Sequence, residues 1–106
     1  MKLGLIGVGY WGKNLARNFN DLGVLNAICD DNKENLSAVG QNYAAIQQYA
    51  GISDLLNDSA IDAVAISTPA ATHGELTRRS LEADKHVFVE KPLCLDLSEA
   101  NEIKQL

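Results

Sequence analysis

Residues 1–19, MKLGLIGVGYWGKNLARNF, decide the fold of this chain. They begin with an apolar run over residues 2–6, continue through Gly7, Gly9 and Gly12, and end in a pattern typical of a helix. Glycines in a G-x-G-x-x-G frame between a buried strand and a helix are typical of a dinucleotide-binding turn. The alternative is a glycine-rich turn that binds no ligand, so the rest of the chain has to decide between them.

Apolar, strand-like runs alternate with helical patterns along the whole sequence. Strands are expected over residues 2–6, 24–29, 44–47, 63–67 and 86–90, and helices over residues 12–22, 32–41, 51–57, 72–83 and 96–106. Strands that are joined by crossover helices form a parallel sheet, and those crossovers are right-handed. The sequence therefore predicts the α/β fold class, as one doubly wound, Rossmann-like domain over residues 1–106.

Two local signals set helix ends. The first helix has an apolar face formed by Leu15, Phe19 and Leu22, and Gly23 stands where a helix-terminating glycine is expected. Residues 72–75, Thr-His-Gly-Glu, fit a capping box at the start of a later helix.

Composition excludes several function classes. The chain has 106 residues, of which 46% are hydrophobic, and a formal net charge of −5, which disfavours nucleic-acid binding. The apolar start is too short for a signal peptide, and no window approaches the ~18 apolar residues of a membrane span. Cys29 and Cys94 lie far apart with no C-x-x-C motif, so we expect reduced packing thiols, no metal site and a cytoplasmic protein.

In its strand–turn–helix context, each glycine of the opening motif has a physical role. Gly7 permits the tight turn, Gly9 lets the backbone approach a pyrophosphate, and Gly12 lets the helix pack closely on the strand. The helix N-terminus supplies unpaired N–H groups and a partial positive charge. We therefore expect a dinucleotide phosphate at this turn, beside the large residues Tyr10 and Trp11, which either cover the cofactor or fill an interface.

Asp30 ends the second strand, 30 − 7 = 23 positions after Gly7. That spacing is close to the ~20 residues typical of a carboxylate that binds the adenosine ribose hydroxyls. A carboxylate there repels a 2′-phosphate, and no arginine follows it, so NAD is favoured over NADP. The alternative is that Asp30 caps the following turn, a role that Asp31 and Asn32 also suit.

Further candidates follow the fourth and fifth strands, at the edge where open α/β sheets bind ligands. Ser67-Thr68-Pro69 offers hydroxyls to the cofactor, or is an ordinary strand-to-helix turn. Glu90-Lys91-Pro92 could place the Lys91 ammonium near the nicotinamide and a substrate hydroxyl. The alternative is that Lys91 is an ordinary solvated surface residue. His73 lies near the same edge, where its role is structural or toward the cofactor.

Taken together, these motifs resemble the glucose–fructose oxidoreductase, inositol dehydrogenase and MocA (Gfo/Idh/MocA) family. The resemblance covers essentially the whole chain, and it rests on the glycine motif, on AISTPAATH over residues 65–73 and on VFVEKPL over residues 87–93. In that family the N-terminal domain binds NAD(P), and the lysine of Glu-Lys-Pro lies beside the nicotinamide and the substrate. The resemblance implies that Lys91 is catalytic and that His73 lies on the cofactor side.

Two stretches narrow the resemblance. GYWGKNLARNF and EKPLCLDLSEA are similar to the branch that oxidises the 3-hydroxyl of UDP-N-acetylglucosaminuronate. Family members continue into a C-terminal α/β domain, so we expect these residues to be an incomplete, N-terminal NAD(P)-binding domain that stops before its last strand and is inactive alone. An exposed sheet edge favours self-association, hence a homo-oligomer. Asp84 stands where the family usually has glycine.

The expected function is hydride transfer between NAD and the carbon of a sugar, polyol or nucleotide-sugar hydroxyl. One alternative is a non-catalytic module that senses NAD(H), which explains the glycines and Asp30 but not Glu90-Lys91-Pro92. Another is a scaffold that binds a sugar nucleotide without redox chemistry.

Overall fold

A computed structural model describes residues 1–9, 12–68 and 70–89 of the chain. Helices and strands alternate along these residues, with one short 3-10 helix, η1. In chain order the elements are β1 Leu3–Ile6, α1 Gly12–Asp21, β2 Leu25–Cys29, α2 Lys33–Gly40, β3 Gln47–Tyr49, α3 Ile52–Leu56, β4 Ala63–Ile66, η1 Ala70–Thr72, α4 His73–Glu82 and β5 His86–Val89.

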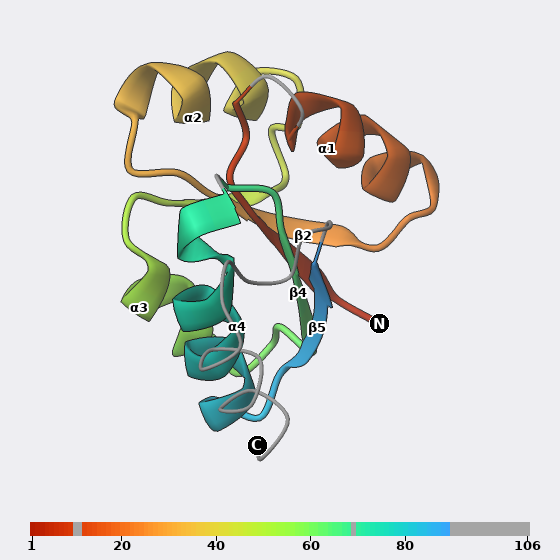
Figure 1. The fold of residues 1–106 in the computed structure, drawn as a ribbon. Coiled ribbons are helices and arrows are strands. Elements are labelled where there is room, and N and C mark those ends of the chain that lie inside the picture. The colour runs from red at the N-terminus through yellow and green to blue at the C-terminus, as the bar shows by residue number, and fades with distance from the viewer. Residues whose placement is uncertain (10–11, 69, 90–106) are drawn as a thin grey trace.

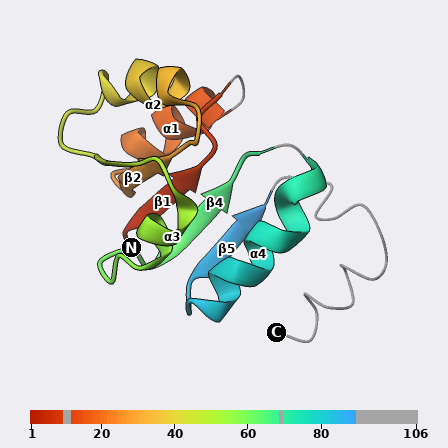
Figure 2. The same ribbon diagram turned by 90° about the vertical axis from the view of Figure 1, so that its left-hand side faces the viewer.

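The strands form one parallel sheet in the order β3-β2-β1-β4-β5. Helices α1 and α2 lie on one face of the sheet, and α3 and α4 lie on the other (Figures 1 and 2). The chain therefore winds outward from β1 in one direction, returns through α3, and winds outward from β4 in the other direction. This confirms the doubly wound, Rossmann-like fold expected from the sequence.

The two central strands are apolar on both faces because both faces are covered. All four residues of β1 and all four residues of β4 are buried. One core cluster joins Leu5 to Leu15 and Phe19 of α1, and the other joins Ile66 to Leu55 of α3. Burial on two sides explains why these strands read as continuous apolar runs in the sequence.

Helix α1 ends one residue earlier than expected. Gly23 has φ 76°, and the Val24 N–H donates to the Phe19 carbonyl at 3.1 Å, as in a Schellman turn. Leu15 and Phe19 pack on the core, but Leu22 is 73% exposed, so its assignment to the apolar face was wrong. Leu22 follows the last helical residue: its N–H still donates to the Asn18 carbonyl at 3.1 Å, but its side chain does not pack on the core.

The third strand was placed too early in the sequence. Residues 44–46 form turns, in which the Ile46 N–H donates to the Tyr43 carbonyl at 3.0 Å, and the strand is Gln47–Tyr49. Tyr43 and Ile46 still pack against the core. The strand itself lies at the edge of the sheet, so polar glutamines replace the expected apolar residues.

Helices α2 and α4 begin in different ways. Asn32 caps α2, because its Oδ1 accepts from the backbone N–H groups of Glu34 and Asn35 at 2.9 and 3.0 Å. Thr72 makes no side-chain cap bond at the start of α4, so the expected capping box is wrong. After η1 the Thr72 backbone is already helical (φ −101°, ψ −7°), whereas a capping side chain requires an extended backbone.

The turn into β5 contains a left-handed residue and a buried cation. Asp84 has φ 63°, a left-handed conformation that aspartate tolerates better than most side chains. Lys85 is 8% exposed, and its Nζ donates to the carbonyl oxygens of Asp58 and Ile61 at 2.9 and 2.6 Å. The ammonium thereby joins the start of β5 to the loop that precedes β4.

We expect Lys85→Met to lower the free energy of unfolding by about 2 kcal/mol, because two carbonyl groups lose a buried donor while the apolar stem is kept. Urea unfolding of the full-length protein measures the change. Lys33→Met, at an exposed position of α2, is the matched control and leaves stability nearly unchanged. Equal stability of the two variants would contradict a structural role for the Lys85 ammonium.

Candidate functional site

The candidate site lies at the carboxyl ends of β1 and β4, where the winding direction of the sheet reverses. Beyond these strands, the Gly7 N–H donates to the Cys29 carbonyl at 2.7 Å and the Ser67 N–H donates to the Ile6 carbonyl at 2.8 Å. The sheet bonding therefore continues into both turns and holds them side by side. Such a reversal point is where open α/β sheets bind ligands.

Two glycines of the opening motif are required by the fold itself. Gly7 has φ 94°, and a Cβ built on it would lie 2.7 Å from the Ser67 carbonyl oxygen. A Cβ on Gly12 would overlap the Gly7 carbonyl. Any side chain at either position would separate the glycine turn from β4 or from the start of α1.

Gly9 differs from the other two glycines. Among the described residues, a Cβ there would contact Asn35 Nδ2 alone, at an ordinary 3.6 Å, and the φ of Gly9 lies outside the left-handed region. Within the described chain nothing requires glycine at this position. The Gly9 carbonyl accepts from the Lys13 N–H at 3.1 Å, so Gly9 stands at the entry to α1. A glycine that the fold does not need leaves room for a ligand to approach the backbone.

The start of α1 suits an anion. Its first turn contains no acidic residue, whereas the first turns of α2, α3 and α4 each contain one. The partial positive charge of the helix N-terminus is therefore not offset by a carboxylate of its own first turn. This is the arrangement that binds dinucleotide phosphates.

Asp30 connects the end of β2 to the glycine turn. Its Oδ2 accepts from the Val8 N–H at 3.0 Å, and its Oδ1 accepts from the Asn32 N–H at 2.8 Å. The turn-capping alternative from the sequence is therefore present in the structure. Each carboxylate oxygen can accept a further hydrogen bond, so these contacts leave capacity for ribose hydroxyls.

Asn35 is a further candidate for the site, and sequence reasoning missed it. It belongs to the first turn of α2, is half-buried, and has the Nδ2 that would be nearest to a Cβ on Gly9. The available signal was its spacing of three residues from the cap Asn32. Helical side chains tilt toward the helix N-terminus, and in the first turn of α2 this tilt brings Asn35 toward the strand ends.

The turn after β4 contains an unpartnered hydroxyl. Ser67 Oγ is buried and has no hydrogen-bond partner among the described residues. It would lie 3.7 Å from a Cβ on Gly12. Thr68 Oγ1 lies 2.7 Å from Thr72 Oγ1, and the Thr68 carbonyl lies 2.5 Å from His73 Nε2. A buried hydroxyl without a partner beside the glycine turn is consistent with a group that a bound ligand satisfies.

Cys29 adjoins Asp30 but is unsuited to nucleophilic chemistry. Burial, with the negative charges of Asp30, Asp31 and Asp54 adding to it, raises the pKa of the Cys29 thiol to about 11. The thiol is therefore protonated at neutral pH, and it packs in the core beneath the site.

The remaining predicted site residues lie outside the described part of the chain, and their roles stay predictions. They are Tyr10, Trp11, Pro69, Glu90, Lys91 and Pro92. Among residues 1–9, 12–68 and 70–89 there is no group of three or more His, Cys, Asp or Glu side chains that could hold a metal ion. The same residues include no helix of the length and apolarity that a membrane crossing demands.

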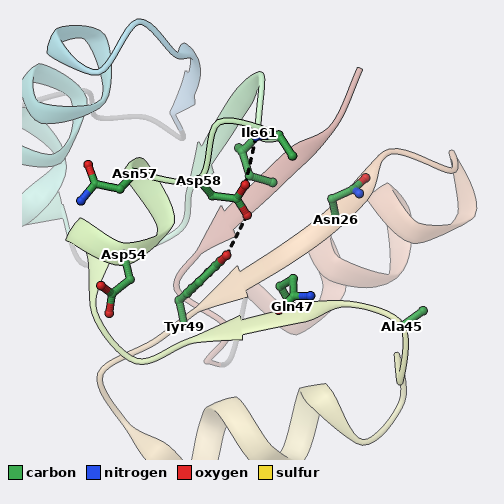
Figure 3. A pocket seen from close by; sticks show the side chains of 9 residues that line it. Asn26, Ala45, Gln47, Tyr49, Asp54, Asn57, Asp58 and Ile61 are labelled. Carbon is green, nitrogen blue, oxygen red and sulfur yellow. Dashed lines mark hydrogen bonds between the residues drawn. The ribbon is translucent and has the colours of Figure 1, made fainter.

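A separate hollow of about 750 Å³ lies beside β3 and α3 (Figure 3). In it the Tyr49 hydroxyl donates to Asp58 Oδ2 at 2.7 Å. This hydrogen bond lowers the pKa of the Asp58 carboxyl from its usual value and raises the pKa of Tyr49. Its lining shares no residue with the predicted set, so it contributes nothing to the site at the glycine turn.

Comparison with known proteins identifies the family. A model described as an oxidoreductase family with an NAD-binding Rossmann fold, Gfo/Idh/MocA, matches residues 1–106. Myo-inositol 2-dehydrogenase of Thermotoga maritima is 34% identical over 103 residues, which cover 95% of this chain and 31% of the relative. UDP-N-acetylglucosamine 3-dehydrogenase of Acidithiobacillus ferrooxidans is 32% identical over 101 residues, with coverages of 95% and 31%.

A solved structure extends the likeness to three dimensions. The WlbA dehydrogenase of Bordetella pertussis, in complex with NADH and UDP-GlcNAcA, has a TM-score of 0.91 at 27% identity, covering 99% of this chain and 32% of that one. The chain belongs to the Gfo/Idh/MocA family of oxidoreductases. It spans about a third of the length of the curated relatives it matches.

The different surroundings of Gly9 and Gly12 generate a paired test. We expect Gly9→Ala to leave the thermal midpoint unchanged and to weaken NADH binding by at least about tenfold, because the new methyl group occupies space left for the ligand. Gly12→Ala overlaps the Gly7 carbonyl, so it should lower both affinity and stability, the latter by about 1–3 kcal/mol.

Nicotinamide fluorescence titration and thermal unfolding of the full-length protein measure the two quantities. Gly51→Ala, at the start of α3, is the affinity control and should bind NADH as the unaltered protein does. Unchanged NADH affinity in Gly9→Ala would show that no ligand approaches this residue.

Proposed function

We propose that the full-length protein is an NAD-dependent oxidoreductase that moves a hydride between the cofactor and a hydroxyl-bearing carbon of a sugar, polyol or nucleotide sugar. The observation that carries the proposal is the glycine turn at the N-terminus of α1, in which a Cβ on Gly9 would meet no described atom closer than Asn35 Nδ2, at 3.6 Å. Membership of an NAD-binding oxidoreductase family supports the same conclusion.

The described residues fit a dinucleotide on two sides. The turn that contains Gly7, Gly9 and Gly12 would adjoin the pyrophosphate, with Gly9 leaving room for its approach, and the α1 N-terminus would supply a favourable potential. Ser67 Oγ is an unused hydrogen-bonding group at the adjacent turn. When bound, the nicotinamide ring supplies the hydride acceptor, and the role of these chain residues is to bind and orient it.

We propose NAD rather than NADP as the preferred cofactor. Asp30 is placed beside the glycine turn by its bond to Val8, and its carboxylate would accept from both adenosine ribose hydroxyls. The same charge would repel a 2′-phosphate, and Asp31 adds a second negative charge next to it.

Lys91 is the proposed catalytic residue, on the resemblance of Glu90-Lys91-Pro92 to the family motif. In the sequence, Lys91 is the second residue after β5, and the neighbour of β5 in the sheet is β4. An ammonium there would orient the substrate hydroxyl and stabilise the alkoxide that forms as the proton leaves. Tyr10, Trp11, Pro69 and Pro92 are proposed to shape the surrounding cofactor pocket.

A nucleotide-sugar hydroxyl is the finer proposal for the substrate. Stretches 9–19 and 90–100 resemble the branch that oxidises the 3-hydroxyl of a UDP-sugar acid. One relative is named as a UDP-N-acetylglucosamine 3-dehydrogenase, and the WlbA dehydrogenase holds NADH together with UDP-GlcNAcA. We further propose a cytoplasmic homo-oligomer that has no nucleic-acid or membrane partner.

The cofactor preference has its own test. Asp30→Ser should weaken NADH binding by about tenfold or more, while NADPH binding falls less or improves, because a ribose acceptor and a repulsive charge are lost together. The ratio of the two affinities is the measurement. The exposed neighbour Asp31→Ser is the control and should alter the ratio far less. An unchanged ratio in Asp30→Ser would contradict the ribose assignment.

Turnover tests the function itself. The full-length protein, given NAD and a panel of polyols and UDP-sugars, should form NADH with at least one of them. Lys91→Met should keep NADH affinity and lose about a hundredfold or more in kcat. NADH binding without turnover on any substrate would favour the NAD(H)-sensing alternative, and failure to bind NADH would reject the proposal.

A further inference from the structure

A buried imidazole lies behind the turn that follows β4. His73 is the first residue of α4 and is 3% exposed. Its Nε2 lies 2.5 Å from the carbonyl oxygen of Thr68. A carbonyl oxygen only accepts hydrogen bonds, so Nε2 carries a proton and donates it.

The accepting residue is part of the wall of the site. Thr68 Cγ2 and the Ser67 carbonyl oxygen would lie 3.0 and 2.7 Å from a Cβ on Gly7, so this turn touches the glycine turn directly. A second bond, between Thr68 Oγ1 and Thr72 Oγ1 at 2.7 Å, joins the same turn to the residue before α4. The turn is thus bonded to α4 on one side and packed on the glycine turn on the other.

We infer that His73 is a positioning residue for the cofactor site. It acts through the Thr68 carbonyl, and it holds the turn so that the unpartnered Ser67 hydroxyl remains beside the glycine motif. The imidazole itself does not touch the cofactor, because it is 97% buried and its Nε2 is engaged with the chain. This role rests on the proposed NAD-binding function. The sequence left the role of His73 as structural or toward the cofactor, and the proposed role is structural, at a position behind the cofactor site.

Two substitutions separate the donated bond from the volume of the ring. In His73→Gln the side-chain Nε2 is the same number of bonds from Cα and can still donate to Thr68. His73→Met has similar reach and no donor. We expect His73→Met to weaken NADH binding by about tenfold and His73→Gln to restore most of the affinity. The exposed His86→Met, on β5, is the matched control and should bind NADH normally.

A measurement without cofactor tests the bond independently. Nitrogen-15 NMR of the ring in the full-length protein should show a slowly exchanging proton on His73 Nε2, which His86 lacks. Absence of that proton, equal affinities of His73→Met and the unaltered protein, or an equal loss in His73→Gln would each overturn the inference while leaving NADH binding by the protein intact. Failure of the unaltered protein to bind NADH would reject the proposed function instead, and the inference with it.

Discussion

The site depends on one close approach, between the glycine turn after β1 and the turn after β4. The two strands are paired in register from Leu3 and Ala63 to Ile6 and Ile66, so the segments that leave them emerge side by side. Gly7 then meets the Ser67 carbonyl with no room for a Cβ, and Gly12 meets the Gly7 carbonyl in the same way. A side chain at either glycine would open the contact and move the start of α1 away from the sheet. A substitution at Gly7 or Gly12 would therefore disturb the fold and the candidate site together.

A third strand end is joined to this contact by a carboxylate. Asp30 links β2 to the glycine turn through the Val8 N–H and links α2 to the same point through the Asn32 N–H. The groups proposed to meet the phosphate and the ribose are therefore held by bonds that the chain makes on its own. Preorganisation of this kind reduces the conformational entropy that binding would otherwise cost. The imidazole of His73 extends the same principle to the β4 side of the site.

The elements that the sequence predicted well are those with strong and local signals. Strands β1 and β4 are buried on two faces, and their apolar runs leave no competing interpretation. The third strand was misplaced because an edge strand tolerates Gln47 and Gln48, while the apolar residues before it form a turn. Thr72 was misassigned as a cap because its hydroxyl lies against Thr68 and its backbone is already helical, and η1, which causes this, has no clear sequence signal.

The sequence by itself determined the fold class and the Gfo/Idh/MocA resemblance, and it predicted the sheet edge of the candidate site, because glycine spacing and strand periodicity are properties of neighbouring residues. Only the tertiary structure decided that close contacts require Gly7 and Gly12, whereas a Cβ on Gly9 would meet no described atom closer than 3.6 Å. It also decided that Asp30 bonds to Val8, that Asn35 lies near Gly9, and that Ser67 keeps an unpartnered hydroxyl. These facts depend on distances between residues that lie far apart in the chain, and such distances exist only once the strands have paired.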